Sequence, residues 1–339
     1  MKNQLFVIIA LLMLNACTAP QTVTDAKQDL TIAFGSCNNQ RLDNYLWKEI
    51  VKHRPSVWIW GGDNVYSDTT DMLVLKKDYE TVLNHPDYKK LKSHAKVLGT
   101  WDDHDYGLND GGVHYAAKKQ SQQAFLDFMG VSKNDKRRQQ EGVYHAETIK
   151  TKGGTVKIIV LDTRYFRSDL TKSANPKRRY DANTYGEGTM LGDTQWAWLT
   201  NELTHSQADF NLIMSSVQVF SDEHGYEKWG NMPHEVDKLL NTIRTSKAKG
   251  VIILSGDRHI SEFSKRNTEG VPYPLIDFTS SGLTHASEGN TSEPNRYRVG
   301  SIVPKISYGL LLFDFKNKTV RMQIRGKEDA LLSELKQEY

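Results

Sequence analysis

The sequence predicts an α/β protein in which two stacked sheets are flanked by helices. Early in the chain, short runs rich in β-branched and aromatic residues alternate with longer amphipathic segments, which is the pattern of strands and helices. The chain closes with YGLLLFDF and KTVRMQIRG, two neighbouring apolar runs that predict a hairpin. Four predicted strands end in clusters of Cys, Asp, Asn, Tyr or His, and strand carboxyl ends share one rim in layered α/β proteins. We therefore expect one functional crevice at that rim.

The predicted elements follow one another through most of the chain. In the helix expected at 193–205, Asp193 can cap the first turn, while Trp196, Leu199 and Leu203 fall on one face. The predicted strands cover residues 30–35, 56–61, 95–100, 155–161, 211–216, 250–255, 273–279, 307–314 and 318–324. The predicted helices cover residues 43–53, 72–84, 114–129, 193–205 and 234–247. Long polar loops cover residues 62–72, 103–113, 163–192, 218–233 and 281–305. Because long ordered loops are usually functional, we expect these to overhang the rim.

The first residues predict export. The apolar run LFVIIALLML at 5–14 is too short to span a bilayer but has the length of a signal-peptide core, so residues 1–16 are expected to be removed. The residues LNAC at 14–17 resemble a bacterial lipobox, which would make Cys17 the lipidated first residue, although a small residue before the cut also fits ordinary secretion. The residue after Cys17 is Thr18 rather than Asp, which resembles the pattern of lipoproteins sorted to the outer membrane. We expect a periplasmic protein of the cell envelope, anchored by lipid to a membrane, with the outer membrane favoured.

Residues 17–29 are expected to form the lipidated N-terminus and a polar tether, 30–330 one domain, and 331–339 a C-terminal tail. The formal charge of +3 falls to +2 without residues 1–16, in which Lys2 is the charged residue. A net charge this close to zero gives no electrostatic reason to expect nucleic-acid binding. We also expect the protein to be a monomer. The basic runs at 134–138 and 175–179 are expected to be solvated loops, or else to shape a field for an anionic substrate near the rim.

The residues at the four strand ends favour a metal site over simple capping. A single Asp after a strand usually caps a helix or forms a turn, but capping requires neither Cys37, nor Tyr66, nor His259. The chain has two cysteines, so Cys37 has no disulfide partner if Cys17 carries lipid. Cys37 could then be a small buried hydrophobe or a metal ligand, and its position directly after a strand favours the ligand.

Six motifs, GSCN, GGDNVYSD, DDHDYGLND, LDTRY, LGDTQWAWL and SGDRHISEF, occur in an order that resembles the alkaline phosphatase D (PhoD-like) family of the calcineurin-like metallophosphoesterase superfamily. The resemblance runs from about residue 30 to about residue 315. It departs from the family at Gly61 and Asn64, and no obvious His follows the run NLIMSS. It implies a four-layer αββα sandwich of two mixed sheets that hydrolyses phosphate esters at a site for Fe³⁺ and Ca²⁺. Two other divalent metal ions are the alternative.

The resemblance also implies the ligands of each ion. Thiolate and phenolate suit a trivalent ion, so Cys37 and Tyr66 would bind iron together with His259. Asp63 would bridge the two ions through its two carboxylate oxygens.

Hard oxygen ligands suit calcium, so Asp103 and Asp257 would bind the second ion, with Asn38 and Asn64 as further candidates. Asn109 and Asp110 could hold calcium or simply turn the chain.

The expected reaction is in-line attack by a metal-bound hydroxide. His104 is expected to protonate the leaving alkoxide, oriented by Asp105 or a neighbouring carboxylate, unless it is a structural histidine. Arg164 is expected to hold phosphate oxygens, unless it forms an ion pair with Asp162 or Glu187. Attack by Cys37 itself is disfavoured, because no Gly-rich loop of backbone donors surrounds it.

The expected activity is that of a phosphomonoesterase (alkaline phosphatase), with phosphodiesterase or phospholipase C-like activity as an alternative on the same site. A lipoprotein that binds phosphate esters with calcium, without turnover, is a second alternative. Tyr115, Tyr226 and Trp229 could line a leaving-group pocket or pack within loops.

Overall fold

The computed structural model describes residues 28–339. The expected signal peptide, the lipidation site Cys17 and nearly all of the expected tether lie outside the described residues. Within residues 28–339, no helix combines the length and apolar character needed to cross a membrane.

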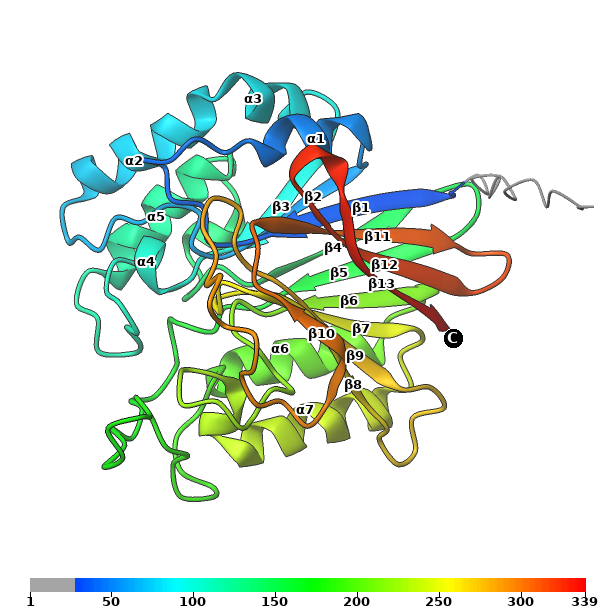
Figure 1. Ribbon diagram of the computed structural model, residues 1–339. Helices are drawn as coiled ribbons and strands as arrows, with labels where there is room; N and C mark the ends of the chain where they lie inside the picture. The colour runs from blue at the N-terminus through cyan, green and yellow to red at the C-terminus, as the bar shows by residue number, and fades with distance from the viewer. Residues whose placement is uncertain (1–27) are drawn as a thin grey trace, which may run out of the picture.

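Two mixed sheets pack face to face, and helices cover the outer face of each, with α1 to α5 on one side and α6 and α7 on the other (Figure 1). The first sheet has the order β13 (Leu331–Glu338), β12 (Thr319–Gly326), β11 (Ser307–Asp314), β1 (Leu30–Gly35), β2 (Val57–Gly61) and β3 (Lys96–Thr100). The second has the order β10 (Arg298–Val303), β8 (Ser261–Arg266), β9 (Leu275–Ser280), β7 (Val251–Ser255), β6 (Phe210–Met214), β5 (Thr155–Val160) and β4 (His145–Lys150). The helices are α1 (Leu46–Lys52), α2 (Met72–Asn84), α3 (Pro86–Lys92), α4 (Asp103–Tyr106), α5 (Lys118–Phe128), α6 (Gly192–Thr204) and α7 (Pro233–Ser246). The predicted αββα sandwich is confirmed.

Strand alternation divides the core into layers. In β1, Ile32 and Phe34 enter the core between the sheets, whereas Ala33 faces the helices. In β2, Ile59 faces the second sheet, whereas Trp58 packs against the Trp47 indole of α1 with ring centroids 5.0 Å apart. Both faces of these strands are therefore buried, which explains why their sequences are continuous apolar runs rather than alternating ones.

The strand directions place the predicted loops at one rim. Strands β1, β2 and β3 are parallel to one another, and so are β5, β6, β7 and β9. A parallel bridge between Ser36 and Ser281 joins the carboxyl ends of the two sheets. The segments that follow β1, β2, β3 and β7 therefore open onto the same region, where the functional crevice was expected.

Four strands were not predicted: β4, β8, β10 and β13. Within 331–339, which was expected to be a tail, residues Leu331–Glu338 instead form edge strand β13, which pairs antiparallel with β12. Most β13 side chains are exposed or half-buried, as are those of edge strand β4. An edge strand with one solvated face carries no apolar run, so its sequence gives little sign of a strand.

Gly309 in β11 is required by the aromatic ring beside it. Phe34 lies opposite Gly309 in the ladder between β1 and β11, and a Cβ at Gly309 would lie 2.1 Å from the Phe34 ring. We expect Gly309→Ala to lower the free energy of unfolding by about 1–3 kcal/mol, because the buried ring cannot move without disturbing the core. Gly289→Ala is the control, since a Cβ there meets nothing within 4 Å, and it should change stability by less than about 0.5 kcal/mol. Denaturant unfolding measures both, and equal stabilities would contradict the expectation.

Candidate metal centre

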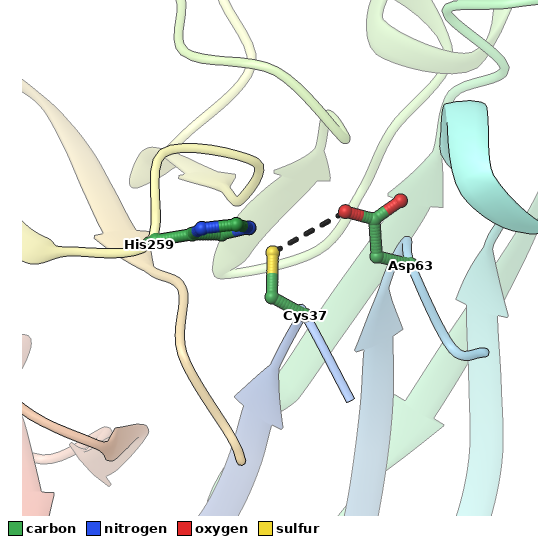
Figure 2. A group of neighbouring side chains, drawn as sticks. All are labelled: Cys37, Asp63 and His259. Atoms are coloured by element: carbon green, nitrogen blue, oxygen red, sulfur yellow. Dashed lines mark hydrogen bonds between the residues drawn. The ribbon is translucent and has the colours of Figure 1, made fainter. Parts of the chain in front are cut away.

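Three predicted ligands from distant segments meet at the rim. Cys37 Sγ, a carboxylate oxygen of Asp63 and a ring nitrogen of His259 all lie within 4.8 Å of one another (Figure 2). Cys37 Sγ lies 3.4 Å from Asp63 Oδ2. The Tyr66 hydroxyl completes the group, at 2.9 Å from His259 Nε2 and 3.2 Å from Asp63 Oδ2. A thiol, a phenol, an imidazole and a carboxylate thus converge on one small volume.

A second group of carboxylates shares Asp63 with the first. Oxygens of Asp63, Asp102, Asp103 and Asp257 lie within 4.8 Å of one another. Asp103 and Asp257 were predicted, whereas Asp102 was not. Because Asp63 belongs to both groups, its two oxygens can serve two neighbouring cations, which is the bridging arrangement that the sequence suggested.

The backbone at these ligands is held in an unusual conformation. Cys37, Asp63, Asp257 and His259 have φ angles of 59°, 50°, 68° and 53°, in the left-handed region that residues other than glycine rarely adopt. Each such residue costs about 1–3 kcal/mol and persists where the surrounding structure fixes it, most often at functional sites. The chain therefore turns sharply after these strands; Asp63, Asp257 and His259 line the crevice, and Cys37 is fully buried beside them.

The electrostatics of the centre favour a bound cation. Burial, reinforced by the charge of Asp257, raises the pKa of the Cys37 thiol to about 11. Burial likewise raises the pKa of Asp63 and of Asp257 well above the ordinary carboxyl range, with neighbouring anions adding to the effect. A cation reverses this balance because it stabilises the deprotonated ligands.

Unpartnered atoms point to the same conclusion. Asp102 Oδ2 and Asn64 Oδ1 are buried and find no hydrogen-bond partner among residues 28–339. Buried polar atoms are normally paired, so orphaned oxygens beside a carboxylate cluster fit missing bonds to a metal. The residues present therefore suit a pair of metal ions.

The two predicted asparagines differ in their surroundings. Asn64 donates to Thr100 O and to Asp105 Oδ2, which leaves its carbonyl oxygen free to act as a ligand. Asn38 uses both ends of its side chain elsewhere, because its amide donates to Asn64 O and its carbonyl accepts from Asn44. The prediction of Asn38 as a ligand is not supported by this geometry, in which Asn38 joins two loops.

Asn109 and Asp110 support a ligand. The Asn109 amide and the Asp110 backbone N–H both donate to Asp103 Oδ2 at 2.7 Å. They orient the Asp103 carboxylate from the loop that follows it.

His104 lies on the wall of the crevice and is held by an aspartate that was not foreseen. Its Nδ1 lies 2.7 Å from Asp68 Oδ2. Burial opposes protonation of His104, but the Asp68 hydrogen bond and the charge of Asp103 outweigh it and raise its pKa to about 9. The expected partner Asp105 is instead fully buried, where it accepts from Asn64, Tyr79 and a backbone N–H.

Arg164 does not face the crevice. Its side chain is fully buried, with Nε donating to Asp102 Oδ1 at 2.5 Å and Nη1 donating to Glu227 Oε2 at 2.5 Å. The expected role as a phosphate fork is therefore wrong, and so are the expected ion-pair partners Asp162 and Glu187. The Asp162 carboxylate accepts from the backbone N–H groups of Arg164, Tyr165 and Val143, and not from the guanidinium. The guanidinium offsets the charge of two buried carboxylates and positions Asp102.

Two other arginines border the crevice, which is a cavity of about 400 Å³. Arg179 pairs with Asp110 at 2.8 Å, and Arg258 pairs with Glu293 at 2.5 Å beneath the Tyr226 ring. The cavity is lined by Asp63, Asp103, His104, Asn109, Asp110, Arg179, Tyr226, Glu227, Asp257, Arg258, His259, Ser287, Asn290 and Glu293. The sequence did not identify Arg258 as a site residue, although it lies between the predicted ligands Asp257 and His259 in the chain.

Of the three aromatic residues considered for a leaving-group pocket, one lines the cavity and two do not. Tyr226 lines the cavity, whereas Tyr115 and Trp229 are buried and donate to Thr69 O and to Ser215 Oγ. Tyr115 and Trp229 therefore pack within the protein.

This fold and its shared carboxylate define a metallophosphoesterase-like α/β protein. The family model described as PhoD-like phosphatase matches residues 32–323. The chain therefore belongs to the PhoD-like phosphatase family, as the motifs predicted.

Alkaline phosphatase D of Bacillus subtilis strain 168 is 24% identical over 310 residues, which cover 75% of this chain and 51% of that protein. The chain thus spans about half the length of this curated relative.

Solved structures agree on the fold. A structure of PhoD superposes with a TM-score of 0.68 at 18% identity, covering 91% of this chain and 70% of the other. A dimetal phosphatase from Danio rerio superposes with a TM-score of 0.54 at 12% identity, covering 92% of this chain and 100% of the other.

The shared position of Asp63 predicts how metal content responds to mutation. Asp63→Asn should lose both cations, because one substitution removes a ligand from each group. Asp257→Asn should lose mainly the cation of the carboxylate group, and the exposed Asp169→Asn should keep both. Elemental analysis of protein purified without added metal measures the content, with thermal unfolding to verify folding. Folded Asp63→Asn protein with full metal content would rule out the shared ligand.

Proposed function

We propose that this protein is a metal-dependent hydrolase of phosphate esters, acting mainly on monoesters. The observation that carries the proposal is the pair of ligand groups joined by Asp63 on the wall of a cavity that also presents His104. When bound, the two cations supply Lewis acidity that activates water for in-line attack and neutralises charge on the phosphoryl oxygens. Membership of the PhoD-like phosphatase family supports this chemistry.

The remaining residues suit the departure of the alcohol. Donation of a hydrogen bond from Nδ1 to Asp68 favours the protonated form of His104, which can then give a proton to the leaving oxygen. Arg179 and Arg258 are each paired with a carboxylate of the lining, so the bound cations would supply the positive charge that favours a doubly charged monoester over a diester. Phosphodiester hydrolysis remains a secondary activity of the same site in this proposal.

The proposed ions are Fe³⁺ in the group with Cys37, Tyr66 and His259, and Ca²⁺ in the carboxylate group. Thiolate and phenolate are strong anionic donors that suit a trivalent ion, whereas carboxylate and amide oxygens suit calcium.

The protein is further proposed to be an exported lipoprotein, anchored through Cys17 in the periplasm. The apolar run at 5–14 and the residues LNAC support this placement.

Proton donation by His104 predicts a dependence on the leaving group. His104→Ala should lower kcat/KM about 10²–10⁴-fold on an alkyl ester such as glycerol phosphate, because an alkoxide leaves poorly without a proton. The loss on p-nitrophenyl phosphate should be much smaller, since its phenolate leaves readily. The exposed His114→Ala is the matched control and should retain wild-type rates on both esters.

Steady-state kinetics of protein loaded with iron and calcium provides the measurement. Equal losses on the two esters would remove the proton-donor role, and wild-type protein inactive on both would remove the hydrolase proposal itself.

The iron assignment predicts colour. A phenolate bound to ferric iron absorbs visible light, so purified protein should show a visible charge-transfer band that Tyr66→Phe abolishes. Tyr185→Phe, which changes an exposed tyrosine, should leave the band unchanged. A band that survives Tyr66→Phe, or a colourless protein rich in other divalent metals, would contradict the assignment.

A further inference from the structure

A second cavity lies at the end of the sandwich opposite the metal centre. It opens where β6, β7 and β9 begin, whereas the metal ligands follow strand carboxyl ends. Its volume of about 540 Å³ lies within the range of ligand pockets. Its apolar lining includes Phe210, Ile243, Val271, Phe315 and Tyr339. None of these residues takes part in the proposed reaction.

The interior of this cavity is apolar and aromatic. The Phe210 ring lies with its centroid 5.7 Å from that of Phe315 and 5.5 Å from that of Tyr339. Ile243 and Val271 add aliphatic surface. The Tyr339 hydroxyl is buried without a hydrogen-bond partner among the described residues. A pocket of this kind suits a flexible hydrocarbon chain better than a polar metabolite.

The lining is cationic as well as apolar. Arg244, Lys247, Lys249 and Lys318 are exposed, and none has a carboxylate within 4 Å in the described part of the chain. The acidic side chain of the lining, Asp209, accepts hydrogen bonds from the backbone and hydroxyl of Thr155. Four unpaired cations around an apolar interior are complementary to an amphiphile with an anionic head group.

The chain enters the domain beside this cavity. The Asp29 carboxylate accepts from the backbone N–H of Phe315, a lining residue, at 3.0 Å. The start of β1 and the end of β13 lie on the same side of the molecule (Figure 1). Cys17 precedes Asp29 by twelve residues, a stretch that can reach at most about 40 Å. A lipid attached at Cys17, as proposed above, would therefore keep this end within about 40 Å of the bilayer.

We propose that this end binds an anionic phospholipid of the membrane surface, with one acyl chain in the cavity and the phosphate among the four cations. The occupant is an anionic lipid rather than the chain's own acylated N-terminus, because a thioether-linked lipid offers no charge to the four cations. The metal centre then faces away from the bilayer. This inference goes beyond phosphate-ester hydrolysis and uses none of its residues.

The test uses mature protein, residues 17–339, carrying Cys17→Ala, so that neither a lipid nor the apolar run at 5–14 is attached. We expect it to sediment with vesicles of phosphatidylcholine and phosphatidylglycerol more than with phosphatidylcholine alone. Changing Lys247, Lys249 and Lys318 together to Glu should lower the partition coefficient at least about tenfold, since each basic residue near the surface contributes to binding. The matched control changes Lys76, Lys77 and Lys90, exposed lysines outside the cavity lining, to Glu and should lower partitioning far less.

Insertion into the cavity is tested separately with dioctanoylphosphatidylglycerol and native mass spectrometry. Val271→Trp, which fills the cavity, should abolish the complex while thermal unfolding stays cooperative. Equal effects of the two lysine triples would overturn the proposal. A complex that survives both Val271→Trp and the Lys247, Lys249 and Lys318 triple would overturn insertion.

A complex formed only by Cys17→Ala protein, and absent from lipidated wild-type protein, would assign the cavity to the protein's own anchor instead. Hydrolysis of p-nitrophenyl phosphate by the triple variants should equal wild type, so this proposal and the hydrolase proposal fail independently.

Discussion

The accumulation of anionic side chains around Asp63 is the constraint on which this architecture depends. Asp63 is buried and Asp257 is half-buried, and neither carboxylate has an ion-pair partner within residues 28–339. Arg164 compensates Asp102 and Glu227 but approaches Asp103 only to 3.9 Å. Unpaired buried charge is costly, so these carboxyls must either bind protons or be stabilised by cations from outside the chain. The proposed metal pair would therefore stabilise this part of the fold as well as serve the proposed reaction.

The sandwich holds these anionic side chains together because the segments at the strand ends are fixed by hydrogen bonds. The bridge between Ser36 and Ser281 ties the two sheets together directly behind Cys37. Asp105 secures the neighbouring loops by accepting from Asn64 and from the buried Tyr79 hydroxyl. Left-handed φ angles at four ligands are tolerated because this framework determines them from several directions. Preorganised ligands lose little entropy when a metal binds, and they hold substrate oxygens in a fixed geometry.

Sequence predicted the parts of the site that depend on strand direction. Parallel strands must deliver Cys37, Asp63 and His259 to one rim, so their convergence follows from pattern alone. The fates of Arg164 and Asn38 did not follow, because their partners, among them Glu227 and Asn44, lie on loops whose paths no local periodicity encodes. The same limit applies to the edge strands, since their one-sided burial removes the apolar run by which a strand is recognised.

The two ends of the parallel strands are suited to different tasks. Carboxyl ends lead into long loops that carry the ligands, whereas the amino ends of β6, β7 and β9 surround an apolar cavity with a basic lining. A strand of five residues is about 17 Å long, so the two sites are separated by roughly the length of one strand. Because the chain enters beside the apolar cavity, a membrane contact at that end leaves the metal centre open to dissolved esters. Under these two proposals, strand polarity determines both where the reaction occurs and which end of the domain faces the lipid.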